Sequence, residues 1–229
     1  FPVCKVMQPA DPRPREPWPG TALCSRGGYS AAMSSTRFHD RVVYAVDDRI
    51  ATITLDRPEK LNAFDSAMYD GVNAAIAAFA VDQSAWAAVI RASGDRAFSA
   101  GADVDALDEN AARGITTGLG GLSIDGDMVT DKPLVVAVHG HCVGEGVNLV
   151  LGCDLVFADT TARFTISEVR IGVNPVEIPA KLAARLGYAR AFSFLALGEA
   201  KDAAWMREAG LVEQVSEAGQ AYADAVAWA

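Results

Sequence analysis

Residues 132–154 read KPLVVAVHGHCVGEGVNLVLGCD, and the pattern changes twice within them. The apolar run that begins at Leu134 predicts a buried strand ending at His139. The glycines between 140 and 146 predict a turn, and the apolar residues of 147–152 begin a helix. A strand that meets a helix through glycines leaves backbone N–H groups pointing outward, where they favour an anion. The stretch is not a dinucleotide-binding fingerprint, because Leu149 stands where the third glycine would be.

The same alternation of strands and helices extends in both directions from this stretch. Residues 42–46 and 50–55 predict a hairpin that turns at Asp47-Asp48. Strands that alternate with helices predict an α/β fold, although no sequence repeat is visible. Further strands are predicted at 87–91 and 155–158, loops at 92–103 and 118–121, and helices at 65–80, from 104, at 179–196, at 200–209 and from 218.

Two other segments carry residue types that suit a functional site. Ala97–Val104 follows a strand and precedes a helix, and its small residues let a ligand approach the backbone closely. Phe164–Gly172 places Glu168 among apolar residues, where a carboxyl group with a raised pKa could serve as acid or base. Each segment also has a simpler interpretation. Ala97–Val104 could be an ordinary loop between a strand and a helix, and Glu168 could be a surface glutamate. Together with the loop at 140–146, the first segment could supply two N–H donors to an oxyanion.

Composition narrows the class of protein. The chain has 229 residues, is 51% hydrophobic and carries a net charge of -9. The acidic balance argues against binding to nucleic acid, although a few local Arg and Lys residues can still hold an anionic ligand. No stretch is long enough to span a membrane, no signal-peptide core is visible and no CxxC pair occurs, so we expect a cytoplasmic protein without a membrane partner. Cys142 and Cys153 lie in apolar stretches and are predicted core residues.

A metal site is conceivable but not expected. His139 and His141 are two residues apart, so on a strand they would face the same side. No third ligand stands at a suitable spacing. No Ser-His-Asp arrangement is recognisable either, which disfavours a serine hydrolase.

The chain divides into an arm and a domain. Residues 1–36 contain six of the ten prolines and predict an extended or disordered arm, while 37–229 predict one globular domain. Met33 is a candidate for the biological start; the alternative is a genuine flexible arm. The helical pattern from Ala218 ends without a stop signal at Ala229, which predicts truncated C-terminal helices.

Five motifs, taken in order, resemble the crotonase superfamily of enoyl-CoA hydratases and isomerases over about residues 40–215. They are Arg57-Pro58-Glu59-Lys60-Leu61-Asn62-Ala63, Ala97-Phe98-Ser99-Ala100-Gly101-Ala102-Asp103, 132–140 running into Cys153-Asp154, Phe164 through Gly172, and Ala209-Gly210-Leu211-Val212.

The resemblance implies a spiral of repeated ββα units that binds acyl-CoA. It implies an oxyanion hole formed by the backbone N–H groups of Ala102 and Glu145, with Glu168 as the catalytic carboxylate. Coenzyme A would arrive as part of the substrate, no cofactor would be bound permanently, and the assembly would be a homotrimer or hexamer. The residues implied to line the coenzyme A path are Leu61, Ala63, Ala100, Asp103 and Val104.

Three departures from the family pattern bear on the reaction. Hydratases of the family use two glutamates, and Asn148 stands at the position of the first, where it cannot exchange a proton. A single glutamate resembles the isomerases, so proton transfer by Glu168 is favoured over hydration. Glu145 replaces a glycine, and its side chain either faces solvent or enters the pocket as a displaced base. The altered stretch 173–180 adds Glu177 as a further candidate acid. The alternatives are a hydratase proper, a non-catalytic acyl-CoA binder, and a structural subunit.

Overall fold

The computed structural model describes residues 35–114, 118–125, 130–175 and 177–229. The described part belongs to one compact unit that runs from Met33 to Ala229. The predicted arm of residues 1–36 lies outside the described residues except for its last two positions, which belong to the first strand. The arm and the question of Met33 therefore stay predictions.

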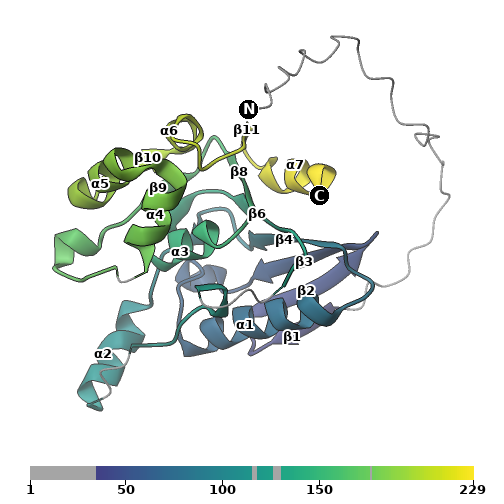
Figure 1. Cartoon of the computed structure of the whole chain (residues 1–229). Coiled ribbons are helices and arrows are strands. Elements are labelled where there is room, and N and C mark those ends of the chain that lie inside the picture. The colour runs from purple at the N-terminus through teal and green to yellow at the C-terminus, as the bar shows by residue number, and fades with distance from the viewer. Residues whose placement is uncertain (1–34, 115–117, 126–129, 176) are drawn as a thin grey trace, which may run out of the picture. The chain divides into compact units, whose positions relative to one another are not determined.

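A seven-stranded sheet forms the centre of the unit (Figure 1). The first three strands pair antiparallel, and the remaining pairs are parallel. The predicted hairpin is present, with Val42 opposite Leu55 and Asp47 opposite Ile50. In sheet order the strands are β1 (Ser35–Phe38), β2 (Val42–Asp47), β3 (Ile50–Leu55), β4 (Ala87–Ala92), β6 (Leu134–Val138), β8 (Leu155–Asp159) and β11 (Gln214–Ser216).

A second sheet consists of four very short strands. In order these are β10 (Lys201–Asp202), β9 (Arg163–Thr165), β7 (His141–Val143) and β5 (Ala97–Ser99). The last three run parallel to one another. The predictions of a loop at 92–103 and a turn at 140–146 were wrong at β5 and β7. A strand of three residues is too short to show an alternating pattern, and it exists only because distant segments pair with it.

The two sheets are connected by a repeated unit. β4 lies in the large sheet and β5 in the small one, and α2 (Val104–Ala112) follows. The same order, a strand of the large sheet, a strand of the small sheet and a helix, recurs in β6, β7 and α3 (Glu145–Leu151). The two strands of the unit recur once more in β8 and β9. The predicted α/β fold with a spiral of ββα units is therefore confirmed.

The predicted α-helices are present except that one is broken at a glycine, and the single turns η1, η2 and η3 were not predicted. Residues 179–196 were expected to form one helix, but Gly187, at φ 76° and ψ 156°, separates two. The other helices and single turns are η1 (Pro58–Lys60), α1 (Ser66–Val81), η2 (Ser123–Asp125), η3 (Glu168–Ile171), α4 (Ile178–Leu186), α5 (Tyr188–Leu197), α6 (Ala203–Glu208) and α7 (Ala221–Trp228).

Both faces of the parallel strands β4, β6 and β8 are buried, whereas β1 is mostly exposed. α1 packs on β2 and β3 as part of the main core, and α7 packs on β6 and β8 (Figure 1). Val135 and Phe157 face α7, while their neighbours Val136 and Val156 face the main core. This explains the unbroken apolar runs, because a parallel strand that is covered on both faces needs no polar alternation. Cys142 and Cys153 are buried, as predicted. Among the described residues, no helix has the length and apolarity that crossing a membrane requires.

Candidate active site

Three loops follow strands of the small sheet and meet at one edge of it. They are 100–103 after β5, 144–145 after β7, and 166–168 after β9. The three strands are parallel and adjacent, so their carboxyl ends lie side by side. A hydrogen bond of 2.9 Å from the N–H of Gly144 to the carbonyl of Thr165 joins the second loop to the third. The small sheet thereby brings together the three segments that the sequence singled out.

The N–H group of Ala102 points toward the β7 side of its strand. The residues on either side of Ala102 both bond to Phe64. The N–H of Phe64 donates to the carbonyl of Gly101 at 2.8 Å, and the carbonyl of Phe64 accepts from the N–H of Asp103 at 2.9 Å. Amide directions alternate along extended backbone, so the N–H of Ala102 points away from Phe64. β7 is the other neighbour of this strand.

Gly101 lets the first two loops approach backbone to backbone. It has a φ of +90°, and a Cβ atom at this position would lie 3.1 Å from the carbonyl oxygen of Val143 and 3.7 Å from the nitrogen of Glu145. Glu145 is the first residue of α3, where N–H groups lack acceptors within their own helix. The two N–H groups predicted to form an oxyanion hole therefore belong to loops in direct contact.

The carboxylate of Glu168 lies directly against the second loop. Its Oε1 is 2.6 Å from the position that a Cβ atom on Gly144 would take, so a larger residue there would displace the carboxylate. Within the described part of the chain, its buried Oε2 has no hydrogen-bond partner. Burial raises the pKa of the Glu168 carboxyl, and backbone hydrogen bonds at Glu168 and Ser167 oppose the rise without cancelling it. The group can therefore act as a base with raised proton affinity.

Asn148 is buried one turn along α3 and is held at both ends of its amide. Its Oδ1 accepts a hydrogen bond of 2.8 Å from Lys181 of α4, and its Nδ2 donates one of 3.1 Å to Oε1 of Glu145. The side chain of Glu145 is therefore turned along α3 toward Asn148.

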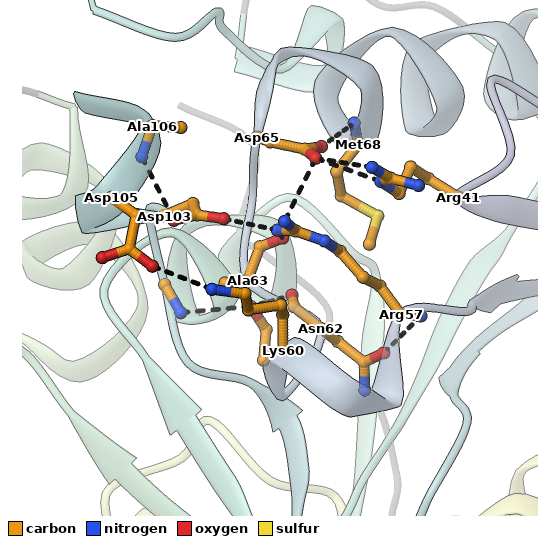
Figure 2. Close-up of polar contacts among 12 residues, drawn as sticks. Arg41, Arg57, Lys60, Asn62, Ala63, Asp65, Met68, Asp103, Asp105 and Ala106 are labelled. Atoms are coloured by element: carbon orange, nitrogen blue, oxygen red, sulfur yellow. Dashed lines mark hydrogen bonds and ion pairs between the residues drawn. The ribbon is translucent and has the colours of Figure 1, made fainter. Parts of the chain in front are cut away.

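The loop that carries Ala102 is anchored by Arg57. Its guanidinium donates to Asp103 at 2.6 Å and to the carbonyl of Ala63 at 3.1 Å, and it lies 3.4 Å from Asp65 (Figure 2). The side chains of Arg57 and Asp103 are only 11% and 7% exposed. Asp65 also accepts two hydrogen bonds from Arg41. The network thus joins the segment 57–65, the start of α1 and the start of α2.

Asp103 has a structural role in this network. Burial alone would raise its pKa, but the hydrogen bonds from Arg57 and from the N–H of Ala106 outweigh burial, and the pKa lies below its ordinary value. Its carboxylate is therefore directed into the protein, and only its backbone is placed to line a ligand path.

The other residues predicted to line a coenzyme path surround the same loops. Leu61 accepts a hydrogen bond of 2.9 Å from the N–H of Ala100, and Ala63 lies beside Arg57. Ala63 is buried, Leu61 and Ala100 are half-buried, and Val104 is exposed at the first turn of α2. The structure thus places all four near one another, which is consistent with one ligand path.

The remaining candidates, Glu177 and the two histidines, do not belong to the three loops. Glu177 is exposed before α4. His139 and His141 are separated by Gly140, which has a φ of +56°, and they lie at a strand end and in another strand. No cluster of three or more potential metal ligands occurs within the ranges that the structure describes.

Two residues of this region received no role from the sequence. Arg57 was noted only as part of a motif, and Lys181 was not singled out. Their partners Asp103 and Asn148 are 46 and 33 residues away along the chain, so no local pattern could have revealed either contact.

A sequence profile of the enoyl-CoA hydratase/isomerase family matches residues 46–229. The mevalonyl-coenzyme A hydratase of Beauveria bassiana is 32% identical over 207 residues, which cover 83% of this chain and 72% of that protein. A probable enoyl-CoA hydratase of Rhizobium meliloti is 31% identical over 180 residues, covering 77% and 69%. Among solved structures, a carnitinyl-CoA hydratase from Mycobacterium avium has a TM-score of 0.74 at 30% identity, covering 84% of this chain and 74% of that one.

Proposed function

The chain belongs to the enoyl-CoA hydratase/isomerase family, and from this premise we propose that Glu168 moves a proton on the acyl group of a coenzyme A thioester. Its substrate is an acyl-CoA, and coenzyme A is part of that substrate. The backbone N–H groups of Ala102 and Glu145 hold the thioester oxygen during the reaction. The favoured reaction is the shift of a double bond in an enoyl-CoA.

The proposed step needs one carboxylate and two N–H donors. Hydrogen bonds to the thioester oxygen stabilise the negative charge that develops when the proton at C2 of a 3-enoyl thioester leaves. Glu168 takes that proton, and the electron pair spreads into a dienolate. The same carboxyl group then returns the proton at C4, which gives the 2-enoyl thioester. No atom is gained or lost, and no water is required.

One observation carries this proposal. The carboxylate of Glu168 lies against Gly144, which precedes Glu145, the residue that supplies the second N–H donor. The buried Oε2 of Glu168 has no hydrogen-bond partner in the described part of the protein. A base beside an oxyanion site is the arrangement that proton abstraction next to a carbonyl requires.

Hydration is the second candidate because of Glu145. Its carboxylate lies 3.1 Å from the amide of Asn148, the residue at the position of the first glutamate in hydratases. A carboxylate is therefore present near that position, although it comes from one turn earlier in α3. If Glu145 held a water molecule there, Glu168 and Glu145 together would act as the pair that hydration uses.

An assay with crotonyl-CoA and a 3-enoyl-CoA tests both reactions. We expect isomerisation of the 3-enoyl-CoA to fall about 10²–10⁴-fold in Glu168→Gln, while coenzyme A binding is kept. Glu213→Gln is the matched control, because this glutamate is exposed between α6 and β11, outside the three loops, and should leave the rate unchanged. Full turnover by Glu168→Gln would refute the role of Glu168.

Hydration of crotonyl-CoA that disappears in Glu145→Gln would establish the second candidate. Coenzyme A binding without either reaction would indicate a non-catalytic binder.

Assembly as a homotrimer or hexamer is part of the same proposal. Tyr188 and Phe192 stack at 6.0 Å on α5, and they are 75% and 59% exposed. Ile171 and Val173, 70% and 53% exposed, lie at and just after η3, which contacts α5. Exposed apolar side chains gathered in this way are typical of a subunit interface. Light scattering of the wild type and of Phe192→Glu measures whether this face holds subunits together.

A further inference from the structure

The buried hydroxyl of Ser99 lies between the two loops that carry the proposed oxyanion donors. Ser99 is the last residue of β5, and its side chain is fully buried. Its hydroxyl accepts a hydrogen bond of 3.2 Å from the N–H of Gly101 and donates one of 2.9 Å to the carbonyl of Asn62. A buried hydroxyl is costly unless it is bonded, and here both its donor and its acceptor functions are used.

Hydrogen bonds within the fold leave one N–H group of the first loop for a ligand. The N–H groups of Ala100 and Asp103 donate at 2.9 Å to backbone carbonyls that lie just before α1. The N–H of Gly101 is taken by the hydroxyl of Ser99. In this loop only the N–H of Ala102 has no acceptor among the described residues. Without the hydroxyl, the backbone at Gly101 would gain the freedom to turn, and the N–H of Ala102 would turn with it.

The acceptor of the Ser99 hydroxyl is itself fixed. Asn62 is 1% exposed and has a φ of +53°, a left-handed conformation that Asn adopts more readily than most residues. Its side-chain amide donates to the carbonyls of Ser93 and Ala97, both at 3.0 Å, and accepts from the N–H of Arg57 at 2.9 Å (Figure 2). The hydroxyl of Ser99 is therefore held on a rigid support and passes that rigidity to the first loop.

Ser99 also contacts the segment that carries the second donor. Gly146 follows Glu145 in the first turn of α3. A Cβ atom on Gly146 would lie 2.9 Å from the Cβ of Ser99 and 3.4 Å from its Oγ, so a larger residue there would push the two segments apart. Ser99 therefore contacts the neighbour of each proposed donor, Gly101 on one side and Gly146 on the other.

We propose that Ser99 is a positioning residue of the oxyanion site. Its hydroxyl fixes the direction of the Ala102 N–H, and its Cβ fixes the distance to the start of α3. The inference rests on the proposed function, because it assumes that the N–H groups of Ala102 and Glu145 hold the thioester oxygen. Such donors act through preorganisation, and a misplacement of about 1 Å can cost about 10²-fold in rate. Because Ser99 is fully buried, it acts through these donors and not on the substrate itself.

Isotope-edited infrared spectroscopy of bound crotonyl-CoA, labelled with carbon-13 at the thioester carbonyl, tests the proposal in the whole chain. Hydrogen bonds to a carbonyl oxygen lower its stretching frequency, so this frequency reports on the oxyanion site. Every sample carries Glu168→Gln, which prevents proton transfer and makes the readout independent of turnover. We expect a lowered frequency where Ser99 is intact, and loss of a large part of that lowering in Ser99→Ala. Alanine keeps the Cβ that contacts Gly146, so this variant removes the hydroxyl alone.

Two further measurements complete the test. In chains that keep Glu168, Ser99→Ala should lower kcat about 10–100-fold and change KM little, because the coenzyme A path is untouched. Gly146→Ala should raise the carbonyl frequency in the same way, since its Cβ would lie 2.9 Å from that of Ser99. Alanine is favoured in a helix, so this variant serves even if Ser99→Ala does not fold.

Thr161→Val is the matched control. The hydroxyl of Thr161 also joins a glycine N–H to an oxygen, since it accepts from Gly140 at 3.0 Å and donates to Asp159 at 2.5 Å. It lies just before β9, at the end of that strand opposite the three loops. Its loss should lower stability but leave the carbonyl frequency and kcat unchanged.

The outcomes separate this proposal from the proposed function. A carbonyl frequency that is not lowered where Ser99 is intact would overturn the oxyanion site and the role of Ser99 together. A lowering that persists in full in Ser99→Ala or in Gly146→Ala would overturn the role of Ser99 alone. So would an equal loss of the lowering in Thr161→Val, because the effect would then be one of general stability.

Discussion

Replacing Arg57 by methionine should destabilise the protein by about 3 kcal/mol. The substitution removes the 2.6 Å bond to Asp103, the 3.1 Å bond to Ala63 and the 3.4 Å ion pair with Asp65. Removing one partner of a buried ion pair costs about 3–5 kcal/mol, because the other charge stays buried. The lower end applies here, since Asp65 keeps Arg41 as a partner and Asp103 keeps the N–H of Ala106. For a domain of this size, the loss corresponds to a fall of about 6–12 °C in Tm.

Urea unfolding followed by circular dichroism measures this loss, with Lys60→Met as the matched control. Lys60 lies in the same segment, but its ion pair with Asp105 is exposed, so its removal should leave the midpoint unchanged.

The stabilisation of the fold by Asp103 should also depend on pH. The pKa of Asp103 is lowered in the folded protein, so the ionised carboxylate stabilises the fold above the ordinary value of 3.8, and this stabilisation is lost as the pH falls below that value. The difference between the wild type and Arg57→Met should therefore shrink at acid pH. Equal midpoints for Arg57→Met and Lys60→Met would refute the reasoning.

Three further predictions concern the loops of the candidate site. Gly144→Ala should lower the isomerisation rate at least about tenfold, because its Cβ would lie 2.6 Å from Oε1 of Glu168. Gly172→Ala, which also has a positive φ but no atom within 4 Å, should keep the rate and lose only stability. The acid limb of the pH–rate profile should lie above 4.5, since the base must be ionised and burial raises the pKa of Glu168; a limb at or below 4.5 would contradict this. Lys181→Met should reduce the free energy of unfolding by about 1–3 kcal/mol in urea titrations, because Oδ1 of buried Asn148 loses a donor; an unchanged midpoint would show that this bond is not needed.

The elements that could be predicted are those with enough residues to display a pattern. The apolar runs of β4, β6 and β8 and the stripe on α1 (66–81) are long, and each follows from burial of one face or both. The three-residue strands β5 and β7 carry no such pattern, because each is stabilised by pairing with segments elsewhere in the chain. The break at Gly187 was also missed, since a glycine near a helix end and one inside a helix look alike without the neighbouring helices.

The candidate site was predictable to the extent that it depends on backbone. Gly101 and Gly144 mark places where a side chain would collide with Val143 or Glu168, and such constraints appear in a sequence as glycines between a strand and a helix. The contacts of Arg57 and Lys181 were not predictable, because a long side chain leaves no trace of its distant partner in the local pattern.

The side chain of Glu145 presents a conflict that Asn148 and Lys181 resolve. The N–H of this residue is proposed to stabilise an enolate oxygen, yet a carboxylate on the same residue would repel that oxygen. Two like charges 4 Å apart oppose each other by about 4 kcal/mol at the effective dielectric of a protein surface. The hydrogen bond from Asn148 draws the carboxylate along α3, and the ammonium group of Lys181, 2.8 Å from the other end of the same amide, brings a compensating charge. In this chain the tether thus offsets the charge that Glu145 brings. Asn148→Ala should consequently lower kcat more than it raises KM, and Glu145→Gly in the same chain should restore kcat. If Glu145→Gly failed to restore it, the carboxylate would not be the source of the loss.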